Sequence, residues 1–526
     1  MRLTRRRALT IAAAGLAAPA LAQGSRVLKF IPHADLTVTD PSWTTAYITR
    51  NHAMMVFDTL YGADAAGAFS PQMAEGHRIE DDGKTWLVTL RDGLKFHDGE
   101  KVVARDAVAS IKRWGVRDNF GQTVLAVSDE ISAPDDRTVK FRLKRPFPLL
   151  PAALGKGGSS VCAIMPERLA GGDPGKVITE VIGSGPYKFV AAERIAGAKA
   201  VYARNEAYAP RASGVASFTA GPKLVNFDRV EWHTITDAAT AGAALQAGEV
   251  DWWENPSADL LPKLRGNKAL TVQVHDKTGY LGFMRLNHVQ PPFDNPAIRR
   301  ALLGAISQED FMIAAAGEDP ANRHTPIGYF APNSPMASDA GLDVFRGKRD
   351  FDKVKREIVA AGYRGEKVVV LVPSDVPILK AIAEIGADTM TRAGLNAESL
   401  YLDWGSMIQR LSRVDAADKG GWSAYHSYWS GLDQFDPAVN SSLRATGRVA
   451  GRPGWPDSPK LEALREQWLA ASGAAEQVRI AGAIQQQALQ DIPYIPLGQM
   501  FAPMAYRANI SGVLDGYALF WNVKRG

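Results

Sequence analysis

The segment from residue 367 to residue 402 constrains the fold most, because it has the pattern of a strand, a helix and a second strand. Residues 368–372 form a continuous apolar run, as in a strand that is buried on both faces. Residues 376–393 have helical periodicity, Gly394 ends the helix, and residues 396–402 again fit a strand. Strands joined in this way lie parallel with a right-handed crossover. The sequence therefore predicts an α/β protein with a parallel sheet.

A second region, residues 65–178, is rich in predicted strands. Apolar residues alternate over 86–90 and again over 94–96, with Asp92-Gly93 between the two runs. Two alternating runs separated by Asp-Gly are typical of a β-hairpin. Residues 102–114 have the spacing of a helix. This region is therefore expected to be a strand-rich unit with one or two helices.

The length and composition are those of a folded protein with more than one domain. A chain of 526 residues exceeds one ordinary core and is sufficient for two or three domains. Because 46% of the residues are hydrophobic and 22% are charged, disordered and collagen-like chains are excluded. Cys162 is the single cysteine, which excludes an intrachain disulfide and a Cys-x-x-Cys zinc site.

Residues 1–22 have the three parts of an export signal. Four arginines, which include Arg5 and Arg6, precede an apolar run over 8–18, and a small-x-small cleavage site ends at Ala22. The apolar run is shorter than the ~20 residues of a membrane-spanning helix. The Arg5-Arg6 pair fits a twin-arginine signal, and an ordinary secretory signal is the alternative. The residue directly after Ala22 is not a cysteine that could carry a lipid, so we expect a soluble periplasmic protein.

Motifs for catalysis, metals, cofactors and nucleic acids are not visible in the sequence. There is no His-Glu-x-x-His, Gly-x-Ser-x-Gly or Walker sequence. Residues 155–158 are glycine-rich but lack the context of a phosphate loop, so they are predicted to form a flexible turn. The formal net charge is +5, and without the four signal arginines it is +1. No basic stripe remains that would follow a nucleic-acid backbone.

Short motifs occur in a fixed order along almost the whole chain. Each is weak alone, but their number and order make a chance match very improbable. The motifs are Asp40-Pro41, Phe57-Asp58-Thr59-Leu60, residues 82–86 and 90–99, Gly183-Ser184-Gly185-Pro186-Tyr187, residues 204–208, residues 245–251 and residues 292–301. Together they resemble those of the peptide/nickel-type extracellular solute-binding proteins, the periplasmic receptors of ABC importers.

This resemblance implies a periplasmic binding protein-like fold. The family has two α/β lobes that close around a solute, with an extra domain inserted in the first lobe. Mapped onto this chain after the signal 1–22, the first lobe comprises 23–64, 179–277 and 492–526, the extra strand-rich domain 65–178, and the second lobe 278–491.

The resemblance also indicates that residues 421–440 face the ligand. In peptide-binding members an aspartate closely follows a Gly-Trp pair and holds the peptide ammonium, whereas no acid follows Gly421-Trp422 here before Asp433. Asp433 or Asp436 can take this role from a longer loop. Core packing is the alternative role for the aromatic residues and for the histidine in this stretch. The expected substrate-binding residues are Trp43, Tyr47, Trp422, Tyr425, His426, Trp429 and Asp433, with Tyr428 as a further aromatic candidate.

The function that the resemblance implies is solute capture without catalysis. We expect a monomeric periplasmic receptor that hands a peptide or peptide-sized solute to an inner-membrane ABC permease, with no cofactor and no metal. An exported enzyme that folds before translocation is the alternative, although no catalytic or cofactor motif supports it. A periplasmic chaperone is a third class. Oligopeptides, modified peptides, opine-like conjugates, nickel chelates and oligosaccharides remain open as solutes.

Overall fold

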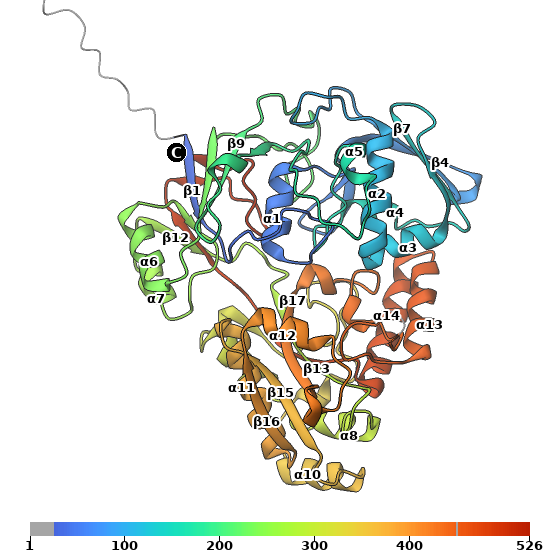
Figure 1. The fold of residues 1–526 in the computed structure, drawn as a ribbon, viewed down its shortest axis with the longest axis vertical. Coiled ribbons are helices and arrows are strands. Elements are labelled where there is room, and N and C mark those ends of the chain that lie inside the picture. Colours follow the sequence, from blue (N-terminus) through green and yellow to red (C-terminus); the bar gives the residue numbers. More distant parts are fainter. Residues whose placement is uncertain (1–25, 449–450) are drawn as a thin grey trace, which may run out of the picture.

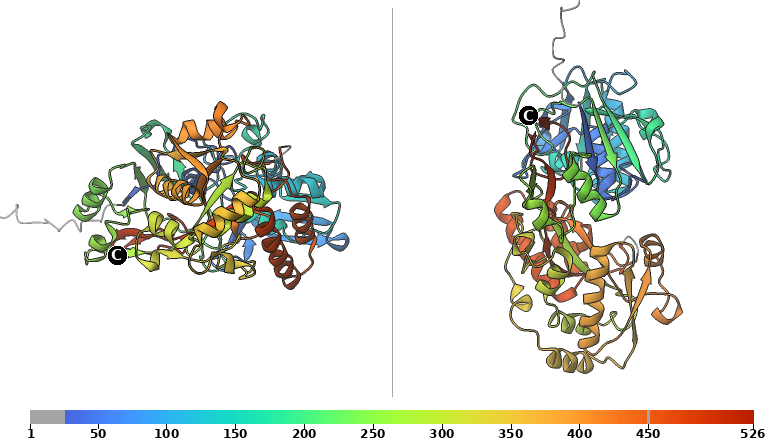
Figure 2. Two further views of the ribbon diagram at one scale, coloured as in Figure 1. Left: turned by 90° about the horizontal axis from the view of Figure 1, so that it is seen from below. Right: turned by 90° about the vertical axis from the view of Figure 1, so that its left-hand side faces the viewer.

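The computed structural model describes residues 26–448 and 451–526. In Figure 1 and in the right view of Figure 2 these residues form an upper body and a lower body. The export-signal residues Arg5, Arg6 and Ala22 lie outside the described residues.

A seven-stranded sheet forms the centre of the upper body. Its strand order is β12-β19-β11-β1-β10-β9-β8, and β1 is parallel to both of its neighbours. Helix α6 follows Asp237, whose carboxylate caps its first turn, and Gly248 ends it at a φ of 79°. The strands are β1 (Val27–Ile31), β8 (Tyr187–Phe189), β9 (Lys199–Arg204), β10 (Arg229–His233), β11 (Trp252–Trp253), β12 (Leu270–Gln273) and β19 (Met504–Arg507); the helices are α1 (Tyr47–Val56), α6 (Ala238–Ala247) and α7 (Leu261–Arg265).

A separate four-stranded antiparallel sheet lies at the upper right in Figure 1. The hairpin predicted over residues 86–96 is wrong, because β5 pairs with β4 on one edge and β7 on the other. The strands are β4 (Ala74–Glu80), β5 (Thr85–Leu90), β6 (Ser128–Ser132) and β7 (Thr138–Leu143), and the small pair β2 (Tyr61–Ala63) and β3 (Phe69–Pro71) lies before them in the chain; the helices are α2 (Ala104–Arg117), α3 (Asn119–Val127), α4 (Leu150–Gly155) and α5 (Glu167–Ala170).

A six-stranded sheet of order β14-β18-β13-β17-β15-β16 forms the lower body. The predicted strand-helix-strand unit is confirmed: β15 (Lys367–Pro373) and β16 (Asn396–Leu402) are parallel and are joined by α11 (Pro377–Arg392). The other strands are β13 (Tyr280–Leu286), β14 (Arg323–His324), β17 (Ala424–Ser430) and β18 (Ile495–Met500); the helices are α8 (Pro296–Leu303), α9 (Gln308–Ala316), α10 (Phe351–Ala360), α12 (Trp404–Leu411), α13 (Pro459–Ala470) and α14 (Ala474–Asp491).

The chain crosses between the two large sheets twice, after β12 and after β18. The expected assignment of residues 492–500 to the first lobe differs from the structure, because β18 pairs with β13 and the second crossing comes only after Met500. The two crossings touch: a Cβ on Gly279, whose φ is +58°, would lie 2.6 Å from the Met500 carbonyl oxygen. Only glycine allows this close approach.

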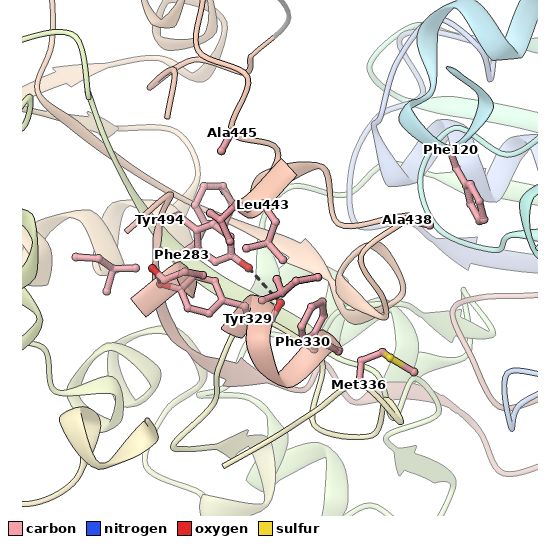
Figure 3. Close-up of a cluster of buried hydrophobic side chains, with 14 of the residues drawn as sticks. Phe120, Phe283, Tyr329, Phe330, Met336, Ala438, Leu443, Ala445 and Tyr494 are labelled. Carbon is pink, nitrogen blue, oxygen red and sulfur yellow. Dashed lines mark hydrogen bonds between the residues drawn. The ribbon is translucent and has the colours of Figure 1, made fainter. Parts of the chain in front are cut away.

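The lower sheet is supported by a cluster of buried aromatic side chains (Figure 3). The Tyr329 and Tyr494 rings lie 4.9 Å apart edge to face, and Phe283 of β13 lies 5.8 Å from Tyr494. The Tyr494 hydroxyl donates a hydrogen bond to the Tyr329 carbonyl oxygen at 3.2 Å. This packing fixes the position of Phe283, which is in contact with the candidate site.

Candidate functional site between the lobes

A hydrogen bond joins the two bodies directly. The hydroxyl of Tyr47, the first residue of α1, donates to Asp433 Oδ2 at 2.8 Å. Asp433 lies in the short helix Gly431–Gln434 that follows β17. The same tyrosine oxygen accepts a hydrogen bond from the backbone N–H of Ser430. Two of the predicted site residues, Tyr47 and Asp433, are therefore brought together from opposite sides of the connection.

The Asp433 carboxylate also binds the segment between α4 and α5. Both the backbone N–H and the hydroxyl of Ser159 donate to Asp433 Oδ1, each at 2.8 Å. The carboxylate is buried and accepts three protein hydrogen bonds in all. Since two carboxylate oxygens can accept about four such bonds, most of this capacity is used by the protein itself. Asp433 thus connects three parts of the chain.

The glycine-rich stretch beside Ser159 is not the flexible turn that the sequence predicted. Residues 155–158 are all buried. A Cβ on Gly158 would lie 2.5 Å from Asp433 Oδ1, so the absence of a side chain lets the backbone approach the carboxylate.

Aromatic rings from both bodies surround the Tyr47 hydroxyl. Tyr280 of β13 lies 5.9 Å from the Tyr47 ring and 5.1 Å from Tyr428 of β17. The Arg50 guanidinium lies 4.7 Å from the Tyr47 ring centre and 3.6 Å from that of Tyr517. Burial, and next the nearby Glu254 carboxylate, raise the pKa of Tyr428, so its hydroxyl stays neutral at ordinary pH. The group presents flat apolar faces with polar edges.

Trp429 lies on the other face of β17. Its ring is parallel to Phe283 within 7°, with the centres 6.5 Å apart. The Arg452 guanidinium carbon is 4.9 Å from the centre of the Trp429 ring. Among the described residues the buried indole N–H of Trp429 has no hydrogen-bond partner. The Trp429 ring therefore packs against Phe283 and also contacts the Arg452 guanidinium.

Trp422, expected to form a wall of the ligand site, lies in the core of the second lobe. Its side chain is fully buried, and its indole N–H donates to the Leu411 carbonyl of α12 at 3.3 Å. Its ring packs against Tyr425 and Trp455. Because core side chains occupy its faces, the structure favours a packing role for Trp422 over the expected ligand wall. Tyr425 packs between Trp422 and Phe283 and serves the same core.

His426 and Trp43 pack against Phe311 and Arg117, respectively. His426 is fully buried and its ring is stacked on Phe311 at 6.2 Å. Burial lowers the pKa of His426 to about 3, so the imidazole is neutral. Trp43 lies under the Arg117 guanidinium, 4.2 Å from the ring centre, against α2. The expected ligand role for His426 is thus replaced by core packing.

Asp436, the alternative acid, has a structural role. Its Oδ1 accepts hydrogen bonds from the backbone N–H groups of Ala438 at 2.7 Å and Val439 at 3.1 Å. This is the geometry of an aspartate that caps a turn.

Sequence reasoning missed several residues at this site. Ser159, Arg50, Tyr280, Tyr517 and Arg452 come from five separate segments, and no motif links them. Only Arg50 lies near a predicted site residue in the sequence, three positions after Tyr47.

Residues 26–448 and 451–526 contain neither a membrane-spanning helix nor a metal-binding cluster. Within those ranges no helix combines the length and the apolar character that a bilayer crossing requires. Nor do three or more His, Cys, Asp or Glu side chains of that part of the chain gather in a way that could hold a metal ion.

Comparison with known proteins shows the family. Residues 68–450 match the model described as bacterial extracellular solute-binding proteins, family 5, middle. The chain belongs to this family. It is similar to a probable peptide ABC transporter periplasmic-binding protein of Sinorhizobium fredii, with 36% identity over 93% of this chain and 92% of the relative. Since the family binds solutes and does not catalyse reactions, the alternative of an exported enzyme is set aside.

Solved structures show the same two-lobed fold. The periplasmic binding protein AgaA of Agrobacterium tumefaciens R10, in complex with agropinic acid, has a TM-score of 0.79 at 20% identity and covers 95% of this chain and 99% of its own. The binding protein DppA of Helicobacter pylori, in complex with the peptide STSA, has a TM-score of 0.77 at 20% identity, with 95% and 98% covered. The periplasmic binding protein-like fold expected from the sequence is therefore confirmed.

Proposed function

We propose that this solute-binding protein captures a peptide or peptide-sized solute between its two lobes and delivers it to an inner-membrane ABC permease. The observation that carries the proposal is the Tyr47–Asp433 contact, which connects the lobes beside a group of aromatic and charged side chains. The peptide class is supported by the name of the Sinorhizobium fredii relative and by the peptide in the Helicobacter pylori structure.

The proposed mechanism is closure of the lobes around the solute. A solute that contacts both lobes binds the closed state more tightly, and only this difference in affinity shifts the population towards closure. Tyr47, Arg50 and Tyr517 would contribute from the first lobe, and Tyr428 and Trp429 from the second. Because Asp433 is largely used by protein donors, it would hold the lobes together rather than bind a solute ammonium.

We also propose that the protein is exported to the periplasm. Residues 1–22 would direct export, with cleavage after Ala22, and the mature chain would act in the periplasm as a monomer without a lipid anchor. The basic, apolar and small-residue segments of the signal support this, as does the periplasmic name of the relative.

Native mass spectrometry of the exported chain, purified without denaturation, tests the proposed solute class. We expect an added mass that is released on denaturation and corresponds to a peptide or peptide-sized compound. Small-angle scattering should then show a smaller radius of gyration with that compound than after its removal. If peptides neither bind nor change the scattering, and a sugar or metal chelate does, the proposed solute class is wrong.

A further inference from the structure

Arg452 is a cation without an acceptor among the described residues. Its side chain is partly buried, and its guanidinium lies over the Trp429 ring. No carboxylate or carbonyl oxygen within residues 26–448 and 451–526 accepts a hydrogen bond from it or forms an ion pair with it. A guanidinium has five N–H donors, and leaving them unpaired away from bulk water is costly.

The two acids that act on Arg452 are already paired with other groups. Asp118 and Asp433 both act electrostatically on Arg452. Asp118 forms a buried ion pair with Lys156, and Asp433 accepts hydrogen bonds from Tyr47 and Ser159. Neither carboxylate lies within ion-pair distance of the Arg452 guanidinium. Asp118 and Asp433 therefore leave the N–H groups of the Arg452 guanidinium available to a carboxylate from outside the protein.

The loop that carries Arg452 is held in place by packing. The backbone N–H of Trp455 donates to the Arg452 carbonyl at 2.9 Å, and the Trp455 ring is buried against Trp422. Gly454, two residues after Arg452, has a φ of +101°, and a Cβ there would lie 2.6 Å from Arg285 Cδ. The backbone N–H of His288 donates to the Gly454 carbonyl at 2.8 Å. Arg452 is thus presented from a fixed turn.

Trp429 supplies a second unpaired donor next to this cation. Its buried indole N–H has no partner among the described residues, and its ring is fixed by Phe283. A carboxylate is the group that matches such a site, because it accepts paired N–H donors of a guanidinium in one plane.

We propose that Arg452, stacked on Trp429, is a specificity-determining residue that binds a carboxylate of the solute. This inference rests on the proposed function and narrows it to solutes that carry an accessible acidic group. For a peptide, this group is the terminal carboxylate or an acidic side chain.

A pair of peptide pools tests the inference. One pool contains mixed tri- and tetrapeptides of neutral side chains with a free terminal carboxylate, and the other contains the same sequences as terminal amides. The wild-type chain should bind the carboxylate pool at least about tenfold more tightly in calorimetry, as expected for a charge-assisted pair. Arg452→Gln should remove this preference, and Arg452→Lys should keep part of it. Arg346→Gln, an exposed arginine of the second lobe, is the matched control and should bind like the wild type.

The outcomes separate the two proposals. If the wild type binds both pools equally, or if Arg452→Gln keeps the full preference with an unchanged melting temperature, the assignment of Arg452 is wrong while peptide capture stands. If the wild type binds neither pool, peptide capture itself is wrong, and the inference falls with it. Arg452→Lys guards against a folding defect, since it preserves the charge and most of the side-chain volume.

Discussion

Gly158 and Asp433 meet so closely that a single methyl group at position 158 would overlap the carboxylate. A Cβ on Gly158 would lie 2.5 Å from Oδ1, the oxygen that accepts both hydrogen bonds from Ser159. The two residues are 275 positions apart in sequence, and this contact links the segment between α4 and α5 to the short helix that follows β17. The lobes are therefore connected through a precise polar contact as well as through the crossing strands.

Gly158→Ala should weaken this connection. Because Asp433 is buried and held by three donors, it cannot move without losing hydrogen bonds that are worth about 1.5–3 kcal/mol each when one partner is charged. We expect a destabilisation of about 1–3 kcal/mol in urea unfolding. Gly482→Ala in α14 is the control, since nothing lies near its Cβ position and alanine favours a helix. Equal stability of both variants would contradict the tight packing at Gly158.

Tyr47→Phe removes the hydroxyl that joins α1 to Asp433 and keeps the ring. We expect the ligand-free chain to populate more open forms, with a larger radius of gyration in small-angle scattering, because one charge-assisted contact between the lobes is lost. Tyr401→Phe is the matched control, as its hydroxyl bonds only to Glu384 on the surface of the second lobe. An unchanged scattering profile for Tyr47→Phe would show that the other contacts, among them those of Ser159 with Asp433, hold the lobes together without this hydroxyl.

The sequence predicted correctly those secondary-structure elements whose partners are close in the chain. The unit from β15 to β16 was predictable because an apolar strand, a helix of 3.6-residue period and Gly394 are consecutive in sequence. The hairpin over residues 86–96 was wrong because β5 finds both of its partners elsewhere in the chain. β18 was assigned to the wrong lobe for a similar reason: its buried residues fit either sheet, and only the long-range pairing with β13 decides.

The candidate site was predictable only in part. Tyr47 and Asp433 were expected through the family resemblance, and the structure brings them into contact. Trp422 was expected on the same basis, but it lies just before β17, and only its long-range contacts with Leu411 and Trp455 place it in the lobe core. Arg452 was missed because its significance lies in the absence of a partner among the described residues, which no sequence pattern records.

Trp422→Ala and Trp429→Ala should have different effects. Removing the fully buried Trp422 leaves a large cavity and should cost about 3–5 kcal/mol of stability. Trp429→Ala should lower solute affinity by about 2 kcal/mol, roughly thirtyfold, because it removes the ring under Arg452. Urea unfolding and calorimetry on both variants separate the two effects. If the Trp422→Ala protein folds with normal stability but does not bind solute, Trp422 is a ligand-binding residue.

Arg5→Lys together with Arg6→Lys tests the export route. The twin-arginine pathway requires the arginine pair itself, whereas an ordinary secretory signal needs only positive charge. We expect the double variant to remain in the cytoplasm as the uncleaved precursor, measured by fractionation and mass spectrometry. The matched control is Arg2→Lys, which lies outside the pair. Normal periplasmic yield of the double variant would assign the chain to the general secretory route and leave solute binding unaffected.

His426 should make the stability of the protein depend on pH. Burial lowers its pKa from 6.5 to about 3 in the folded chain, while the unfolded chain keeps the ordinary value. Below pH 6.5 the unfolded state therefore binds one more proton than the folded state. The free energy of unfolding then falls as the pH decreases, by about 1.4 kcal/mol per pH unit, until the folded-state pKa is reached.

His426→Leu should remove this contribution, because leucine fills the apolar space beside Phe311 and Gly386 without a titrating group. Between about pH 7 and pH 5, the loss of stability in urea unfolding should be smaller than in the wild type by about 2 kcal/mol. His52, which is also fully buried with a pKa of about 3, supplies a separate contribution that remains in this variant. His324→Leu, at an exposed position of β14, controls for the substitution itself. An identical pH dependence in the His426→Leu variant and the wild type would mean that His426 gains a proton without unfolding.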